Sequence, residues 1–185
     1  MKKMLIVMAM LAGFCVAAQA QLQNASFEME GPEGGDRALN WDRWGDWINR
    51  ETGWTPVKDG SCIIGYHHWQ IEKPDDSGLS QDVKVEAGKK YAFSIYANAD
   101  ASTDRPNAES VELRLETTVN DQQSTLASRV YTFADLAKGS DWSKLQVEAV
   151  VPNDTLRVRI IIKPFAQGPR GGAIKLDLAE LSIVP

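Results

Sequence analysis

Most of the chain alternates apolar and polar residues with a period of two. The clearest run covers 111–119, in which Val111, Leu113 and Leu115 are separated by charged side chains. Similar runs lie at 91–98, 145–151, 157–163, 174–178 and 181–183, with Gly, Pro, Asn or Asp between them. Successive side chains of a strand point to opposite faces, so each run predicts a strand with one buried face. With one helical turn expected near 133–138, the pattern predicts an all-β domain, a sandwich or a barrel.

The same alternation predicts which side chains point into the core and which reach solvent. The predicted core positions on three strands are Tyr91, Phe93 and Ile95, then Val111, Leu113 and Leu115, then Val158, Ile160 and Ile162. The opposite positions are polar and include Tyr96, Arg114, Glu116, Arg159 and Lys163. If these strands are neighbours, one sheet exposes an aromatic ring beside charged groups. An ordinary solvated sheet face with cross-strand ion pairs is the simpler interpretation, and the pattern alone favours it.

Five tryptophans, Trp41, Trp44, Trp47, Trp54 and Trp69, lie within 29 residues. Trp is large and rarely fully buried, so this density indicates that some of the rings are exposed for recognition. A flat ring packs on the C–H face of a sugar, while charged or amide side chains bind its hydroxyl groups. The alternative is that the cluster closes one end of the sandwich, and we expect this of Trp44. We expect Trp69 to be exposed at the end of a strand, and Trp54 lies on a loop where either role fits.

The first 20 residues have the pattern of a secretory signal peptide. Lys2 and Lys3 precede an apolar run over 4–16, and Ala18-Gln19-Ala20 is a small-x-small cleavage site. The run is shorter than the ~20 residues that a membrane-spanning helix needs. We therefore expect cleavage near Ala20, a periplasmic or extracellular location, no membrane insertion, and one domain over 21–185.

Charge and cysteine content exclude several classes of function. The whole chain has a net charge of −5, and the part after the two leader lysines is more acidic still, at −7. This balance argues against nucleic acid and anionic membranes as partners, because both require clustered Lys and Arg. Cys62 is the one cysteine after the leader, which excludes a disulfide scaffold, and we expect it to be buried.

Three segments, in order, resemble the CenC-like carbohydrate-binding modules. Segment 22–28 (LQNASFE) resembles their opening N-x-x-F-E, 78–94 resembles their central G-hydrophobic-x-Q-x-V block, and 172–183 resembles their closing strand. The resemblance implies a jelly-roll β-sandwich of two antiparallel sheets, of the galactose-binding-like kind. It implies a secreted, non-catalytic module that binds a poly- or oligosaccharide on the concave sheet.

The resemblance also implies binding residues and a metal. By position, the ligand contacts of the family correspond to Trp69, Tyr96 and Lys163, although the family often has a carboxylate or an amide where Lys163 stands. The face analysis adds Arg114 and Glu116, and Trp54 completes the candidate set. The family usually holds a structural Ca²⁺ between its first and last strands, and Glu28 and Asp177 would supply carboxylates to it.

Two other functions compete with glycan binding. An adhesion or assembly module would bind a protein partner, such as a cell-surface protein or a separate glycan-degrading enzyme, through the Trp-rich end. A small glycosidase or lyase would need two carboxylates about 5–10 Å apart. Glu112 and Glu116 share a strand face but are ~13 Å apart, which is too far. We therefore expect a monomeric binding protein and no enzyme.

Overall fold

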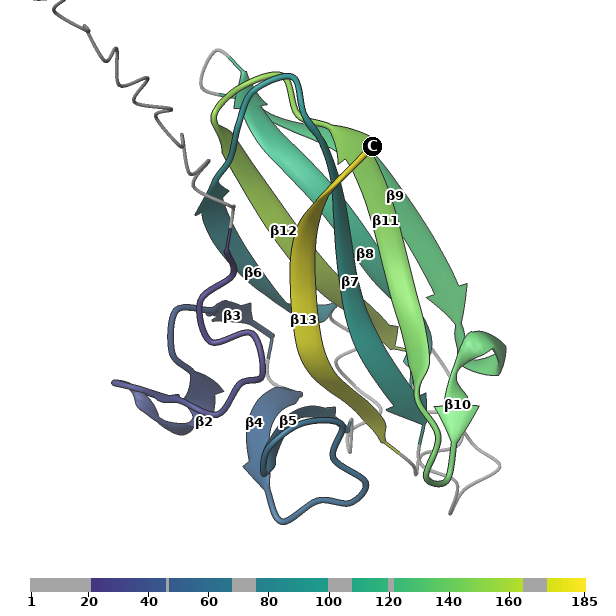
Figure 1. Cartoon of the computed structure of the whole chain (residues 1–185). Helices are drawn as coiled ribbons and strands as arrows, with labels where there is room; N and C mark the ends of the chain where they lie inside the picture. Colours follow the sequence, from purple (N-terminus) through teal and green to yellow (C-terminus); the bar gives the residue numbers. More distant parts are fainter. Residues whose placement is uncertain (1–20, 46, 68–75, 100–107, 120–121, 165–172) are drawn as a thin grey trace, which may run out of the picture.

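Two β-sheets pack face to face in the computed structural model, which describes residues 21–185 except 46, 68–75, 100–107, 120–121 and 165–172. The five-stranded sheet has the order β3-β6-β12-β8-β9, and the second sheet has the order β10-β7-β13-β5-β4, with β11 also paired to β7. Figure 1 shows β6, β12, β8 and β9 as one layer behind β13, β7 and β11. All strand pairs are antiparallel except the short β10–β7 pair. The predicted all-β sandwich is confirmed.

The strands cover most of the described chain. They are β1 (Glu30–Gly31), β2 (Gly34–Ala38), β3 (Asp42–Trp44), β4 (Ile48–Thr52), β5 (Cys62–Tyr66), β6 (Ser77–Lys84), β7 (Lys90–Ala99), β8 (Ala108–Val119), β9 (Gln122–Thr132), β10 (Ala137–Lys138), β11 (Ser143–Val150), β12 (Thr155–Pro164) and β13 (Ile174–Val184). A three-residue 3-10 turn, Phe133–Asp135, occupies the predicted helical position. Among the described residues, no helix is long and apolar enough to cross a membrane.

The core lies between the two sheets, where the alternation places it. All nine predicted core residues of β7, β8 and β12 are fully buried. Two of the clustered tryptophans also belong to this interior. Trp41 is buried against Phe27, with the ring centroids 5.3 Å apart, and Trp47 packs partly buried against the core. The cluster therefore closes part of the sandwich, as one interpretation predicted, and Cys62 is buried as expected.

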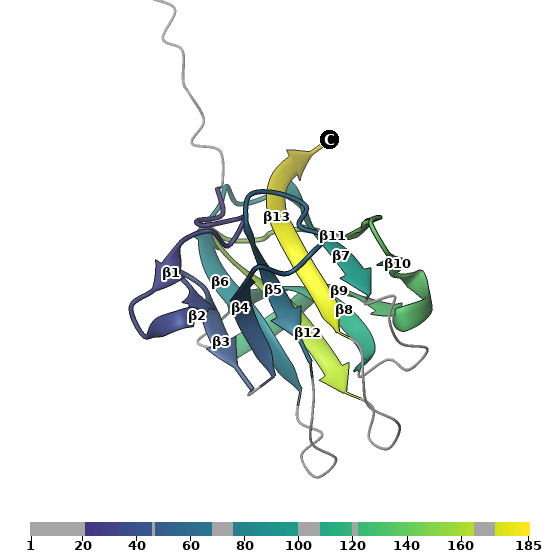
Figure 2. The ribbon, with the colours of Figure 1, turned by 90° about the horizontal axis from the view of Figure 1, so that it is seen from below.

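The N-terminal part of the chain lies along one edge of the sandwich. In Figure 2 the β1–β2 hairpin flanks β3 and β6 at this edge. The edge strand β3 pairs with β6 over only three residue pairs, Asp42↔Ser80, Arg43↔Leu79 and Trp44↔Gly78. On the N-terminal side of Asp42, the chain turns away from β6 at Asn40, whose φ of 66° is left-handed. This edge borders the outer surface of the five-stranded sheet.

Candidate functional site

The outer surface of the five-stranded sheet carries an aromatic ring and a dense set of charges. We refer to it as the Trp44 face; it comprises Trp44 from β3, Ser80 and Asp82 from β6, Glu112, Arg114 and Glu116 from β8, and Arg157, Arg159 and Lys163 from β12. Arg159 stands opposite Ser80 on one side and Arg114 on the other, and Arg157 stands opposite Asp82 and Glu116. The register therefore brings residues from four chain segments into one surface.

Trp44 lies directly on the backbone of β6. A Cβ atom at Gly78 would stand 2.2 Å from Cζ2 of the indole, so only glycine leaves room for the ring there. The guanidinium of Arg159 lies over the same ring, 4.6 Å from its centroid, in cation–π contact. The expectation that Trp44 closes the end of the sandwich is wrong, because Trp44 alternates outward from β3 and remains partly exposed.

Salt bridges fix the charged groups of the Trp44 face. Arg114 Nε donates to Glu112 at 2.8 Å, and Arg159 Nη1 donates to Glu116 at 3.0 Å. Lys163 Nζ lies 3.7 Å from Glu112. Both glutamates are only 4% exposed, so the basic side chains form the solvent-facing layer above them. The charges are thus arranged before any ligand arrives.

The Glu112 and Asp82 carboxylates of this face are held in the charged form. Burial alone would raise the pKa of Glu112, but the hydrogen bond and charge of Arg114, with Lys163 and Ser128, outweigh it and lower that pKa. The hydrogen bonds from Arg157 lower the pKa of Asp82. Oε2 of Glu116 is buried and has no hydrogen-bond partner among the described residues. An enclosed water molecule would satisfy this acceptor.

The structure divides the predicted binding residues between two faces. Arg114, Glu116 and Lys163 lie together on the Trp44 face, whereas Tyr96 lies on the outer surface of the other sheet. The expectation that Tyr96 shares a face with Arg114 is wrong, because β7 and β8 belong to different sheets and the condition of neighbouring strands is not met. Trp69 lies outside the described residues.

Tyr96 and Trp54 both lie over the outer surface of the six-stranded sheet. Tyr96 has the Lys58 and Lys144 ammonium groups 4.4 and 5.6 Å from its ring centroid. Trp54 lies against Gly65, and its centroid is 5.0 Å from that of the His67 ring. Loop 53–61, which supplies Trp54 and Lys58, covers this part of the sheet. The Trp54 ring thus packs between its loop and the sheet, on the side opposite Trp44.

Glu28 and Asp177, the predicted calcium ligands, anchor the same loop by hydrogen bonds. Asp177 Oδ2 accepts from the backbone N–H groups of Lys58 and Asp59, at 2.8 and 3.0 Å. Glu28 Oε1 accepts from the backbone of Ser61 and Cys62, at 2.9 and 2.8 Å. Backbone N–H groups are thus the partners of both carboxylates, and within the described chain no three His, Cys, Asp or Glu are grouped to hold a metal. A structural Ca²⁺ at Glu28 and Asp177 stays a prediction of the family resemblance.

Sequence reasoning missed Trp44 and Arg159 as site residues. A strand of three residues is too short to show a period of two, so β3 gave no signal for the direction of Trp44. Gly78 was an available signal, since a glycine inside a strand often marks the close approach of another group. A tryptophan within the preceding segment was the natural candidate for that group.

Comparison with known proteins identifies the fold. No family model and no curated protein matches the chain. Among solved structures, TmCBM61 in complex with β-1,4-galactotriose aligns with a TM-score of 0.61 and 14% identity, over 88% of this chain and 97% of that one. A cyclase from Fischerella sp. TAU aligns with a TM-score of 0.62 and 15% identity, over 91% and 98%. The CBM22-1 xylan-binding domain from Paenibacillus barcinonensis aligns with a TM-score of 0.52 and 16% identity, over 86% and 91%. The chain therefore has the jelly-roll β-sandwich fold of carbohydrate-binding modules.

Proposed function

We propose that the protein is a carbohydrate-binding module that docks a poly- or oligosaccharide on the Trp44 face. The observation that carries the proposal is the partly exposed indole of Trp44, which is fixed on Gly78 beside paired arginines and glutamates. The exposed part of the indole, beside the Arg159 guanidinium that lies over the ring, offers apolar surface to the C–H groups of a sugar. The neighbouring Arg114 and Arg159 offer N–H donors to its hydroxyl groups.

The salt bridges favour a binding surface that is rigid before the ligand arrives. Long side chains lose conformational freedom on binding, which weakens affinity, unless they are already ordered. Arg159 is ordered by both the Trp44 ring and the Glu116 carboxylate. Because the basic groups already have acidic partners, the face suits a neutral, hydroxyl-rich ligand better than an acidic one.

We propose binding without catalysis. A general acid in a glycosidase needs a raised pKa so that it carries a proton near neutral pH. On the Trp44 face the pKa of Glu112 is instead lowered, and Arg159 and Arg114 contact Glu116. These features suit carboxylates that hold the basic side chains in position. The same fold occurs in a cyclase and in binding modules, so the fold alone does not decide between catalysis and binding. The residues of the Trp44 face favour binding.

Secretion belongs to the same proposal. The leader over 1–20 would be removed near Ala20, and the exported domain would meet polysaccharide outside the cell. The competing adhesion function receives less support, because Trp41, which lies in the Trp-rich segment, is buried in the core. Trp41 cannot form the exposed aromatic anchor that a protein partner would need.

Affinity gel electrophoresis against a panel of soluble polysaccharides tests this function. We expect at least one neutral polysaccharide to retard the wild-type protein. Trp44→Ala should bind it roughly thirtyfold more weakly, as for a central aromatic contact worth ~2 kcal/mol. Tyr96→Ala is the matched control on the opposite face and should migrate like the wild type. A panel in which no polysaccharide retards the folded wild-type protein would refute the proposal.

A further inference from the structure

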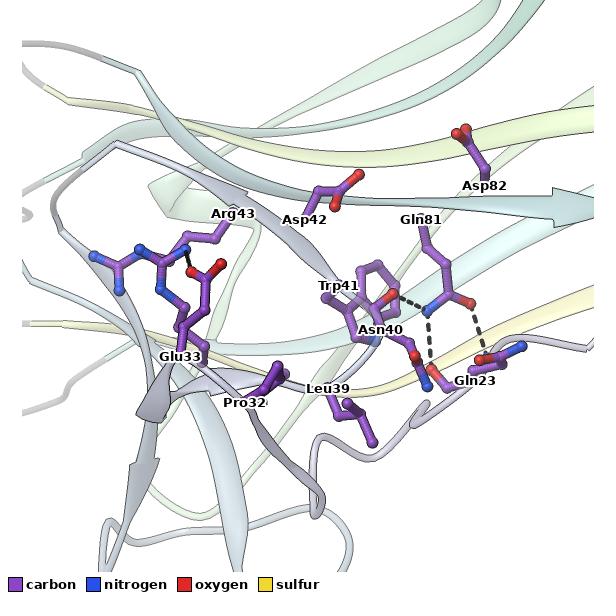
Figure 3. Close-up of a pocket in the computed structure, with 13 residues that line it drawn as sticks. Gln23, Pro32, Glu33, Leu39, Asn40, Trp41, Asp42, Arg43, Gln81 and Asp82 are labelled. Carbon is purple, nitrogen blue, oxygen red and sulfur yellow. Dashed lines mark hydrogen bonds and ion pairs between the residues drawn. The ribbon is translucent and has the colours of Figure 1, made fainter.

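A pocket opens where β3 separates from β6. The two strands pair only from Trp44 to Asp42, after which β6 continues without β3 as its neighbour. The β1–β2 hairpin closes over the gap and leaves a pocket of about 450 Å³ (Figure 3). This volume falls within the range of sites that bind small ligands, about 300–1,000 Å³. The pocket therefore has room for a small ligand unit.

The wall of the pocket is built around the side-chain amide of Gln81. Its oxygen accepts from Gln23 N at 2.8 Å, and its nitrogen donates to the carbonyl oxygens of Gln23 and Asn40 at 3.0 and 2.9 Å. Figure 3 shows this amide between the two segments. Gln81 thus takes the place of a missing strand partner and fixes the left-handed turn at Asn40. These three hydrogen bonds hold the wall in place, which reduces the entropy cost of binding.

The pocket is continuous with the Trp44 face through two carboxylates. Asp42 and Asp82 line the pocket, and they also lie on the same strand faces as Trp44 and Ser80. Four residues along a strand span ~13 Å, which is the separation between Gly78, beneath the Trp44 ring, and Asp82. A saccharide chain that lies on Trp44 and runs along β6 therefore reaches the pocket.

The lining suits a neutral sugar residue. Its charges are largely paired with one another or with nearby groups: Arg37 with Glu33, Arg43 with Asp36, and Asp82 with Arg157. Asp42 is exposed and forms no direct ion pair among the described residues, although its charge acts on Arg157, so its oxygens are available to ligand hydroxyl groups. Pro32 and Leu39 supply apolar contacts. We propose that the pocket is a second subsite, which binds one neutral sugar residue of the saccharide held on the Trp44 face; this inference rests on the proposed function.

Isothermal titration with oligosaccharides of increasing length, cut from a polysaccharide that binds, tests the second subsite. Leu39→Trp fills the pocket, and Asp42→Ala removes its free carboxylate. Both variants should bind the shortest oligosaccharides as the wild type does. They should bind the longer ones about tenfold more weakly, the loss expected for one or two missing hydrogen bonds. Lys84→Ala, further along β6 and largely exposed, is the control and should match the wild type at every length.

The outcomes separate the subsite from the function itself. If both pocket variants bind every length as the wild type does, the subsite is refuted while glycan binding stands. Equal losses at all lengths also refute it, because the pocket would then be the primary site. If no saccharide binds the wild type, the proposed function fails instead. If Leu39→Trp proves unstable in thermal melting, Asp42→Ala on the exposed strand edge decides the question alone.

Discussion

Gly78 determines how Trp44 lies on the sheet. A Cβ atom there would meet the indole at 2.2 Å and the carbonyl oxygen of Ile160 at 2.3 Å, which are distances that real Cβ atoms do not adopt. The indole, Arg159 and Glu116 then form one chain of contacts across β3, β6, β12 and β8. One residue without a side chain thus sets the position of the aromatic ring in the candidate site.

Gly78→Ala should therefore displace the Trp44 ring. We expect a loss of about 1–3 kcal/mol in the free energy of unfolding, the usual cost of forcing an extra methyl group into a packed position. We also expect weaker saccharide binding at a pH and temperature where the variant is folded. Urea denaturation followed by tryptophan fluorescence measures the first effect. Ser80→Ala, at a neighbouring small residue on the same face, is the control, and equal stability of Gly78→Ala and wild type would contradict this account.

Loop 53–61 shows how single side chains organise a whole element. Asp177 on β13 is fully buried and accepts three backbone hydrogen bonds, from Lys58, Asp59 and Leu178. Burial raises its pKa, against the lowering effect of those hydrogen bonds. Glu28 holds the other end of the loop through Ser61 and Cys62. The loop in turn covers part of the six-stranded sheet, where Trp54 lies against Gly65 and Lys58 over Tyr96.

Asp177→Ala should destabilise the protein even without calcium. Removal of the carboxylate leaves three backbone N–H groups without their acceptor, so we expect a loss of about 3 kcal/mol in the free energy of unfolding. Urea denaturation in the presence of a chelator measures it, with Asp59→Ala as the control on the same loop. If Asp177→Ala matches the wild type in chelator and is weaker only with added Ca²⁺, the carboxylate serves the metal that the family resemblance implies.

At the element scale, the alternation predicted strands and their buried faces but not their neighbours. Tyr91, Phe93 and Ile95 are buried as expected, because the period depends only on residues within one strand. Whether β7 pairs with β8 depends on contacts between distant segments, and the two strands join different sheets. Arg114, Glu116 and Lys163 were therefore grouped correctly, whereas Tyr96 was placed with them wrongly. The position of Trp44 depended on a three-residue strand that carries no period.

At the scale of the whole molecule, the two outer surfaces differ in what they offer a ligand. The six-stranded sheet is partly covered by loop 53–61, and its Tyr96 ring lies beneath two lysines. The five-stranded sheet presents Trp44 and an ordered layer of arginines. The pocket beside β3 extends this surface along β6. The asymmetry predicts a single saccharide-binding side.

Mapping of a bound oligosaccharide by NMR tests this central claim most directly. The ¹⁵N-labelled protein is titrated with an oligosaccharide of the polysaccharide that binds, and shifts of the backbone and indole N–H signals are followed. We predict that the largest shifts fall on β6, β8 and β12 and on the indole N–H of Trp44. Shifts concentrated on β7 and β11 around Tyr96, with the Trp44 signal unchanged, would contradict the account.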